Sequence, residues 1–327
     1  MAKSEKVSER TTCSFLGITR RTIQNWRSQG YRDKRKGSHR YVPRRLSKEE
    51  QDAFYEQATN SRFKDSTPEQ IVAILSQEGN YIASASTLYR ILRARKANAH
   101  RQQTKKPVAS LSSRYITVTA PNQVWVWDIT WLKTDVRGQF KYGYTIMDLY
   151  DRSIVGWSIE DNESDEHSKR LFERIIRDLK VVPQIVHADN GHPMRGVTLA
   201  VFLDSLFISR SYSRPRCSND NAAMESWHKT LKYTVGYPEF FTSLGHARTW
   251  YADFVHWYNN EHLHSGLDYV TPMQVRTGEA LALYSKRNNT LALAHATHPD
   301  RWIKNKVRVY SLPSVKAFYR PINKAAE

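Results

Sequence analysis

The central part of the chain shows strand-like alternation of apolar and polar positions, followed by segments with helical spacing and short apolar runs. The first three predicted strands are joined by a VRG turn and by a tight turn at Asp151-Arg152, which is typical of an antiparallel meander. In chain order, the predicted elements are strands 124–133, 138–150 and 151–160, helix 165–180, strand 182–190, helix 197–206, strand 207–212 and a helix from Ser218 or Asn219 to about Val235. This order predicts an α/β fold with a mixed five-stranded sheet and helices on both faces.

The N-terminal segment has only helical patterns. Within residues 1–30, Gly17 makes a turn between two short predicted helices, and Thr19 can cap the second of them. This layout predicts a helix-turn-helix that binds DNA. Its outer face is expected to consist of Arg20, Arg21, Gln24 and Asn25. Any helical hairpin gives a similar pattern, so a hairpin without DNA contact is the alternative.

The pattern over residues 47–96 predicts three further helices, which would form a second trihelical helix-turn-helix domain. The expected N-terminal caps are Ser47 with Glu50 as its capping-box partner, Thr67, and either Ser84 or Ser86. On the third helix, Arg90 and Arg93 point outward if the apolar stripe points inward. Such a helix is suited to the major groove of DNA.

Positive charge is concentrated in the first third of the chain. The formal net charge is +18, and residues 1–110 hold 23 Lys and Arg against 10 Asp and Glu, whereas residues 111–327 hold 27 against 22. This asymmetry favours a nucleic-acid-binding region joined to a more neutral domain. A surface charge that only keeps the protein in solution is the alternative.

Two polar segments are interpreted as linkers. Residues 31–46 carry seven Lys and Arg against one Asp and are expected to follow DNA phosphates as a basic arm, with a merely solvated linker as the alternative. The candidate contacts in this arm are Lys34, Arg35, Lys36, Arg40, Arg44 and Arg45. Residues 97–114 are interpreted as a second, interdomain linker.

Composition argues against membrane and secreted proteins. No apolar run reaches the roughly 18 residues that a membrane span needs, and the N-terminus lacks the apolar stretch of a secretory signal. The two cysteines, Cys13 and Cys217, lie far apart, which excludes a disulfide framework and a cysteine-rich zinc site. A location in a reducing cytoplasm is therefore expected.

Three acidic residues occupy positions where an α/β sheet gathers ligands. Asp128 lies on the first predicted strand, Asp189 ends the fourth, and Glu225 follows Asp189 after 35 intervening residues, on the helix after the fifth strand. A lone aspartate at a strand end is most often a turn residue or a cap. Three acids together are suited to a pair of Mg²⁺ ions that activate an attacking oxygen and stabilise a leaving oxygen in phosphodiester transfer.

The first predicted strand has two different faces. Val124, Val126, Asp128, Thr130 and Leu132 share one of them, and Trp125, Trp127, Ile129 and Trp131 share the other. The tryptophans would therefore fix the strand from behind while Asp128 faces a cleft with the other two acids. Because clustered carboxylates repel one another, divalent ions are expected to stabilise the fold.

The segments around these acids resemble a known family. Asp128 in WDIT, Asp189 in HADNG and Glu225 in DNAAMESWHKTLK resemble the D, D-x35-E catalytic core found in the RNase H-like superfamily of transposases and integrases. The segment WYNNEHLHSGLDYVTP, residues 257–272, is similar to the end of that core in transposases of the third insertion-sequence family. The resemblance covers about residues 115–275.

The resemblance implies an RNase H-like integrase catalytic core over residues 115–275 and leaves residues 276–327 as a basic C-terminal tail. It implies a DNA transposase that binds the terminal inverted repeats of an insertion sequence, cleaves DNA and transfers the 3′-OH to target DNA. Asp128, Asp189 and Glu225 would be the catalytic residues and the ligands of two Mg²⁺ ions, for which Mn²⁺ can substitute. The implied partners are double-stranded DNA, both transposon ends and target, and further copies of the chain in a dimer or larger synaptic complex; the implied location is the nucleoid of a bacterial cytoplasm.

Two lysines follow Glu225 on the same predicted helix. Lys229 and Lys232 are expected to hold phosphates of the transposon end, and an ordinary salt bridge on a solvated helix is the alternative. His187, His192 and His228 are interpreted as structural, because two-metal chemistry does not require a histidine. Two other functions stay open: a nuclease of the same fold without strand transfer, and a DNA-binding regulator with an inactive core.

Overall fold

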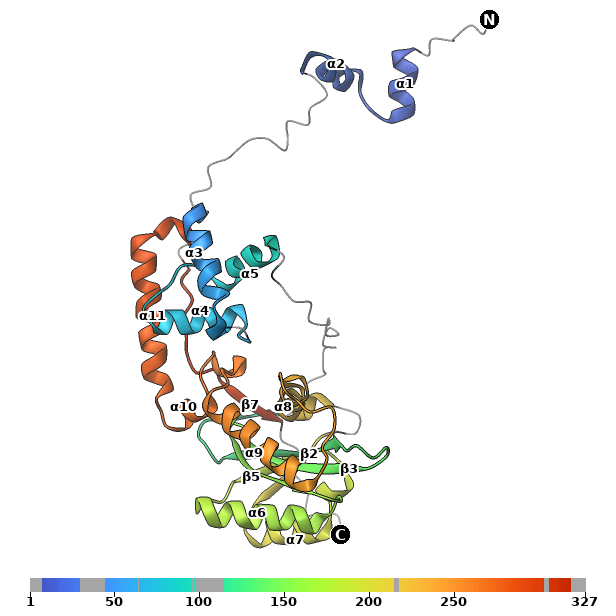
Figure 1. Cartoon of the computed structure of the whole chain (residues 1–327), viewed down its shortest axis with the longest axis vertical. Coiled ribbons are helices and arrows are strands. Elements are labelled where there is room, and N and C mark those ends of the chain that lie inside the picture. Colours follow the sequence, from blue (N-terminus) through green and yellow to red (C-terminus); the bar gives the residue numbers. More distant parts are fainter. Residues whose placement is uncertain are drawn as a thin grey trace, which may run out of the picture. The chain divides into compact units, whose positions relative to one another are not determined.

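The computed structural model describes residues 8–29, 45–63, 65–95, 97, 115–214, 218–302 and 306–318. The chain divides into two compact units, residues 1–45 and residues 46–327 (Figure 1). No helix in the described part of the chain is both long enough and apolar enough to cross a membrane.

The first unit contains the two short helices expected there, α1 (Glu9–Leu16) and α2 (Arg20–Gln29). Gly17 ends α1 in the left-handed conformation at φ 64°, a backbone geometry that glycine adopts without steric cost. The Thr19 hydroxyl accepts the amide hydrogen of Thr22 at 3.3 Å and so caps α2. Of the residues expected in the basic arm, Lys34, Arg35, Lys36, Arg40 and Arg44 lie outside the described residues, and Arg45 is exposed.

The second unit is built around the mixed five-stranded sheet that was expected, with the strand order β4-β3-β2-β5-β6. Strands β2, β3 and β4 form the predicted antiparallel meander, and β5 and β6 run parallel to β2. Their bounds are β2 Val124–Lys133, β3 Phe140–Asp148, β4 Ile154–Glu160, β5 Ile185–Ala188 and β6 Ser209–Tyr212. The RNase H-like mixed sheet with flanking helices is therefore confirmed.

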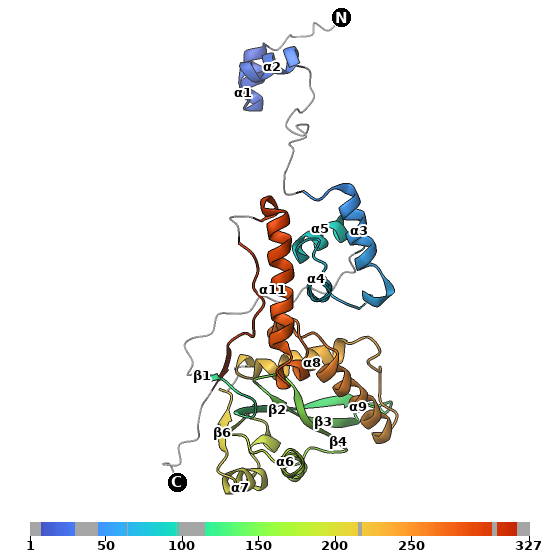
Figure 2. The ribbon, with the colours of Figure 1, turned by 90° about the vertical axis from the view of Figure 1, so that its left-hand side faces the viewer.

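Helices cover both faces of this sheet (Figure 2). One face packs against α6 (Asp165–Leu179) and α7 (Val197–Ser205), and the other against α8 (Ala222–Tyr233) and α9 (Leu244–Asn260). Alternate side chains of β2 belong to the two layers. Trp125 and Trp127 pack toward α6 and α7, whereas Val124 and Val126 pack toward α8 and α9. The two faces predicted for this strand are thus confirmed.

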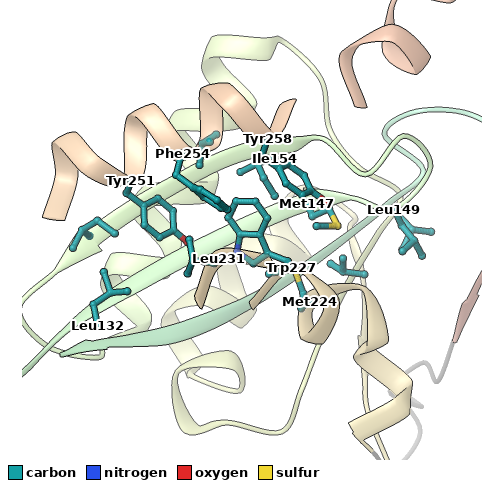
Figure 3. Close-up of a cluster of buried hydrophobic side chains, with 14 of the residues drawn as sticks. Leu132, Met147, Leu149, Ile154, Met224, Trp227, Leu231, Tyr251, Phe254 and Tyr258 are labelled. Carbon is teal, nitrogen blue, oxygen red and sulfur yellow. The ribbon is translucent and has the colours of Figure 1, made fainter. Parts of the chain in front are cut away.

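The α8–α9 layer has an aromatic core (Figure 3). Trp227 of α8 makes an edge contact with Tyr258 of α9, with ring centroids 4.6 Å apart, and a tilted contact with Phe254 at 5.2 Å. Met224 and Leu231, one helical turn on either side of Trp227, are fully buried in the same cluster. This packing fixes which side of α8 faces the sheet, and therefore which side is left exposed.

The three helices expected over residues 47–96 are α3 (Lys48–Ala58), α4 (Pro68–Gln77) and α5 (Ala85–Ala94). The capping box of Ser47 and Glu50 is present, and Thr67 caps α4 with Gln70 as its partner. Their core is formed by Phe54, Ile71, Leu75, Leu88 and Ile91, among others. Short 3₁₀ turns complete the second unit at Ser61–Phe63, His192–Met194, Ser218–Asn221, Ser265–Leu267 and Pro299–Arg301.

Residues 276–327, expected as a basic tail, contact both the sheet domain and the three helices. Helix α10 (Pro272–Arg276) leads into α11 (Ala280–Thr297), where Arg287 donates to Gln77 of α4 at 3.0 Å. Arg301 donates to Glu50 of α3 at 2.7 Å. Strand β7 (Val315–Phe318) pairs antiparallel with β1 (Tyr115–Val118) at the start of the core. The described part of this segment is therefore packed against other parts of the second unit, and the expected domain divisions stay predictions.

Gly156 of β4 sits where strand and helix approach closely. A Cβ atom at this position would lie 2.0 Å from Cδ1 and 2.3 Å from Cγ1 of Ile175, a buried residue of α6. We expect Gly156→Ala to lower the free energy of unfolding by about 1–3 kcal/mol, because either α6 or β4 must shift. Urea unfolding measures the change. Gly245→Ala in α9 is the control, since its Cβ would meet no atom closer than 3.8 Å, and equal stability of both variants would contradict the prediction.

Candidate active site

Asp128 and Asp189 both follow the parallel pairing of β2 with β5. The last paired residues are Val126 and His187, and each acid comes two positions later on its own segment. Because Val124 and Val126 pack toward α8 and α9, residue 128 lies on that same face of the sheet. Asp128 keeps a side chain that is 21% exposed.

The turn after β5 holds the Asp189 carboxylate. Its Oδ1 accepts the amide hydrogen of Gly191 at 2.8 Å, and Asn190 donates to the Ser213 carbonyl at 2.6 Å. A Cβ at Gly191 would lie 2.7 Å from Sδ of Met194 and 3.0 Å from Asp189 Oδ1, so only glycine fits this turn without displacing the carboxylate. The Asn-Gly turn predicted from the sequence therefore fixes the acid at the end of the strand.

Glu225 reaches the same region from the first turn of α8. Asn221 Nδ2, just before this helix, donates to the Trp127 carbonyl of β2 at 3.4 Å, next to Asp128 in sequence. Upstream, buried Asp220 accepts two hydrogen bonds from the guanidinium of Arg214, at 2.8 and 2.9 Å. These two ties and the buried face of α8 orient Glu225 toward the sheet edge.

The electrostatics of Asp128 reflect the two other acids. Burial raises the pKa of Asp128, and the negative charges of Asp189 and Glu225 raise it further, while a hydrogen bond from the Ile129 amide lowers it; the resulting value is about 7. The ionised carboxylate is thus disfavoured without a positive partner. The repulsion among the three acids therefore raises the pKa of Asp128.

The three carboxylates fit a hard divalent cation by their chemistry. Mg²⁺ prefers oxygen ligands and takes few of them from protein, and a cation here would relieve the repulsion that raises the pKa of Asp128. Among the residues that the structure describes, no three His, Cys, Asp or Glu side chains already stand close enough to hold one ion. Ion binding would therefore require the three side chains to move toward one another.

Most of the predicted DNA-contact residues are exposed. Lys229 and Lys232 are exposed on α8, as are Arg90 and Arg93 on α5, with Arg90 donating to Thr87 at 3.0 Å. In the first unit, Arg21, Gln24, Asn25 and Arg20 are exposed, and Arg20 Nε lies 4.0 Å from Glu9 Oε1. Exposure is compatible with DNA contact, and the assignment of these residues stays a prediction.

One of the three histidines near the acids lies closer to the site than the sequence indicated. His228 Nδ1 lies 3.6 Å from Asp128 Oδ2, and its Nε2 is buried without a hydrogen-bond partner among the described residues. Burial, with a smaller effect of Lys232, lowers the pKa of His228 to about 4, so the ring is neutral near pH 7. His187 is buried against Ser211, with 2.9 Å between Nδ1 and Oγ, and His192 is exposed.

A buried ion cluster at the β3–β4 corner was missed at the sequence level. Asp148 and Asp151 are both fully buried, which no local pattern around them indicates. Arg276 of α10 lies 3.1 Å from Asp148 Oδ2 and 3.2 Å from Asp151 Oδ2. Arg276 also donates to the Ser153 hydroxyl at 3.0 Å. The cluster ties the end of the core to its central hairpin.

Comparison with known proteins covers this region directly. A family model described as an integrase core domain matches residues 118–218, and a second model of the same description matches residues 207–272. The central part of this chain is therefore similar to integrase core domains. Asp128 and Asp189 lie within the first match and Glu225 within the second.

Curated relatives are also similar to this chain. The transposase of insertion sequence IS904 from Lactococcus lactis subsp. lactis is 32% identical over 173 residues, which is 50% of this chain and 64% of that protein. The transposase InsF of IS3A from Escherichia coli is 28% identical over 158 residues, 48% of this chain and 54% of that protein. The chain thus spans somewhat more than half the length of these relatives.

Two solved structures are also similar to the chain. A simian T-cell lymphotropic virus intasome, solved in complex with PP2A regulatory subunit B56 gamma, has 17% identity and a TM-score of 0.42 over 63% of this chain and 73% of that chain. The HTLV-2 integrase catalytic core domain in complex with magnesium has 20% identity and a TM-score of 0.36 over 47% of this chain and 96% of that chain.

His264, near the end of the integrase core, makes the stability of the fold depend on pH. Its Nδ1 accepts the amide hydrogen of Gly266 at 2.9 Å and must be unprotonated to do so. Burial, helped by Arg152 and His262, lowers the pKa of His264 to about 3. A group whose pKa is depressed on folding contributes stability above its unfolded pKa of about 6.5, and that stability is lost as the pH falls toward the folded value.

We therefore expect the integrase core to lose stability between about pH 6.5 and pH 4, and His264→Asn to lose less, since asparagine can accept the same amide hydrogen without titrating. Each pKa unit corresponds to about 1.4 kcal/mol. Urea midpoints measured across this range for both proteins give the comparison. Parallel pH profiles for wild type and His264→Asn would contradict the assignment.

Proposed function

We propose that this chain is a DNA transposase that cleaves a DNA strand at each end of an insertion sequence and joins the released 3′-OH to target DNA. The observation that carries the proposal is that the charges of Asp189 and Glu225 both act on Asp128, within the stretch that matches the integrase core models. The names of the aligned relatives, which are transposases of insertion sequences, support the same function.

In this proposal, Asp128, Asp189 and Glu225 hold two Mg²⁺ ions, with Mn²⁺ as a substitute. When bound, such ions supply Lewis acidity that activates the attacking oxygen and stabilises the leaving oxygen. The chain contributes the orientation of the carboxylates: the Gly191 amide holds Asp189, and the tie from Asn221 to the Trp127 carbonyl holds the start of α8 beside Asp128. Lys229 and Lys232 would bind the phosphates that flank the reacting one.

Terminal repeats would be recognised by the two helical regions. Arg20, Arg21, Gln24 and Asn25 of α2 and Arg90 and Arg93 of α5 would contact DNA, together with the basic arm over residues 31–46. Two ends must be held together for joining, so a dimer or larger assembly is part of the proposal.

A footprinting and strand-transfer experiment tests the function. The probes are duplexes carrying the two terminal sequences of the element that encodes the chain, with and without Mg²⁺. We expect protection of both ends, cleavage only with the divalent ion, and a product in which the end is joined to target DNA. Cleavage without joined product would support the nuclease alternative. Protection without cleavage would support the regulator with an inactive core.

Metal binding has a readout that is independent of DNA. We expect Mg²⁺ or Mn²⁺ to raise the melting temperature of the wild-type protein, because ions that bind only the folded state stabilise it by about 1.4 kcal/mol at tenfold their dissociation constant. The rise should be absent in a variant that combines Asp128→Asn with Asp189→Asn. A melting temperature of the wild type that does not respond to either ion would contradict the proposed metal site.

A further inference from the structure

On the exposed side of α8, two cations and one aromatic ring form a row that begins beside Glu225. The row consists of Lys229, Lys232 and Tyr233. Lys229, Lys232 and Tyr233 follow Glu225 at four, seven and eight residues, which sets all of them on the side of the helix that carries the acid. The opposite side, with Trp227 at its centre, is buried against the sheet and α9 (Figure 3). The row therefore leads from the active site along an outward-facing surface.

Within the described residues, the two lysines of this row lack an acidic partner, and the ring of Tyr233 packs against no other ring. Tyr233 is 82% exposed and neighbouring Val235 is 81% exposed. Within the described residues, Tyr233 makes neither a hydrogen bond nor a ring contact, and neither Lys229 nor Lys232 lies within salt-bridge distance of an acid. Two free cations beside an open aromatic ring match a ligand that has both negative charge and flat apolar faces.

The segment after Tyr233 is held in place, so the ring projects from a fixed support. The amide of Tyr237 donates to the Thr234 carbonyl at 3.2 Å, and the Trp250 indole donates to the Gly236 carbonyl at 3.2 Å. The Phe241 amide donates to the Lys133 carbonyl at the end of β2 at 2.8 Å. A preorganised surface of this kind loses less conformational entropy on binding than a free loop.

Resting on the proposed function, we propose that Tyr233 stacks on an unpaired base at the end of the DNA that the active site cleaves. Lys229 and Lys232 contact phosphates of the same strand. The eight residues from Glu225 to Tyr233 rise by about 12 Å along the helix, which corresponds to roughly three or four nucleotides at B-form spacing. Aromatic stacking next to cations is how proteins bind single strands without reading their sequence. Tyr233 thereby separates the last base pairs and presents the strand to the three acids.

Fluorescence of a base analogue tests this contact before any chemistry occurs. The probe is a duplex with the terminal sequence of the element that encodes the chain and with 2-aminopurine at successive positions within about four nucleotides of the cleaved phosphate, measured without divalent ion. We expect one of these positions to become unpaired in the complex and to be quenched by stacking on Tyr233. In Tyr233→Ala, this quenching is lost and binding weakens by about tenfold, whereas Tyr233→Phe keeps both.

Phe207→Ala is the matched control. Phe207 is an equally exposed aromatic residue, 95% exposed, that follows α7 in the opposite layer of the fold. It should change neither the quenching nor the affinity. Identical quenching and affinity for Tyr233→Ala and wild type would overturn the stacking contact, even if wild type cleaves the DNA. A Tyr233→Ala variant that changes only the oligomeric state would also overturn the stacking contact, because Tyr233 would then contact a second copy of the chain. A wild-type protein that neither protects nor cleaves the ends would overturn the proposed function itself.

Discussion

Asp128→Asn, Asp189→Asn and Glu225→Gln are each expected to lower DNA strand cleavage by about a thousandfold or more while leaving DNA binding in place. Each substitution keeps the shape of the side chain but removes the negative charge that a divalent ion needs. The ions supply several kcal/mol of transition-state stabilisation in phosphoryl transfer, and each 1.4 kcal/mol or so changes a rate tenfold. Cleavage of labelled end DNA under single-turnover conditions measures the loss, and footprinting of the same variants measures binding.

The same substitution at Asp128 is expected to stabilise the protein when divalent ions are removed with a chelator. The folded environment disfavours the charged carboxylate through burial and through the charges of Asp189 and Glu225, which together raise its pKa to about 7. Removing that charge should add on the order of 2 kcal/mol to the free energy of unfolding, after allowance for solvent screening. A substitution that lowers activity but raises stability is typical of a site where catalysis requires like charges to lie close together.

Asp253→Asn provides the control for both measurements. Asp253 is an exposed aspartate on α9, so its loss should change neither cleavage nor unfolding. A variant of Asp128, Asp189 or Glu225 that cleaves as well as Asp253→Asn would remove that residue from the catalytic set. Loss of stability in Asp128→Asn would contradict the electrostatic account while leaving the catalytic one open.

Strand periodicity was sufficient to predict how Asp128 is presented. Because side chains alternate with a period of two, a single strand defines which residues share a face, and the pattern of β2 follows that rule. The position of Asp189 relative to Asp128 depends instead on the register between β2 and β5. That register pairs residues about sixty positions apart, and no local pattern in either strand specifies it.

Other elements were missed for reasons that the structure makes clear. Helix α9 had no counterpart among the expected elements, although its buried positions recur at helical spacing. Its partly buried tryptophans, Trp250 and Trp257, widen the apolar pattern around the helix and obscure one face. Strand β1 has four residues and pairs only with β7, so its stability depends on tertiary packing rather than on local pattern.

The interactions of His228 illustrate the limit of spacing arguments in the site itself. Its place three residues after Glu225 indicates a position on the same helix but not its burial or its distance from Asp128. Both depend on how α8 rotates against the sheet, and that rotation is set by Trp227 packing between Phe254 and Tyr258 of a helix that was not foreseen. The buried cluster around Arg276 is a second case of the same kind, because its partners are 128 positions apart in the chain.

Arg276→Met is expected to destabilise the second unit by about 3–5 kcal/mol, the largest stability effect that we anticipate. The substitution keeps much of the apolar stem and removes the cation that faces Asp148 and Asp151, both fully buried. Amides of Asn122 and Tyr150 donate to Asp148 and would remain, so the loss isolates the contribution of the guanidinium. Urea unfolding gives the magnitude, and Arg177→Met, which removes an exposed pair with Asp178, should cost under about 1 kcal/mol.

The pH dependence of Arg276→Met distinguishes a missing charge partner from a packing defect. Burial and the neighbouring Asp151 already raise the pKa of Asp148 to about 6, and Arg276 acts in the opposite direction. A carboxyl whose pKa is raised on folding contributes stability below its unfolded value of about 4 that is lost as the pH rises through the folded value. Without Arg276, the folded pKa rises further, so the deficit of the variant should grow as the pH rises above about 6, where Asp148 ionises in the folded wild type but stays protonated in the folded variant. Adding Asp148→Asn and Asp151→Asn to Arg276→Met should remove that pH dependence, because neither side chain then titrates. A deficit that is equal at every pH would mean that Arg276 stabilises the corner by packing and hydrogen bonds to Ser153 and Asn122 rather than by its charge.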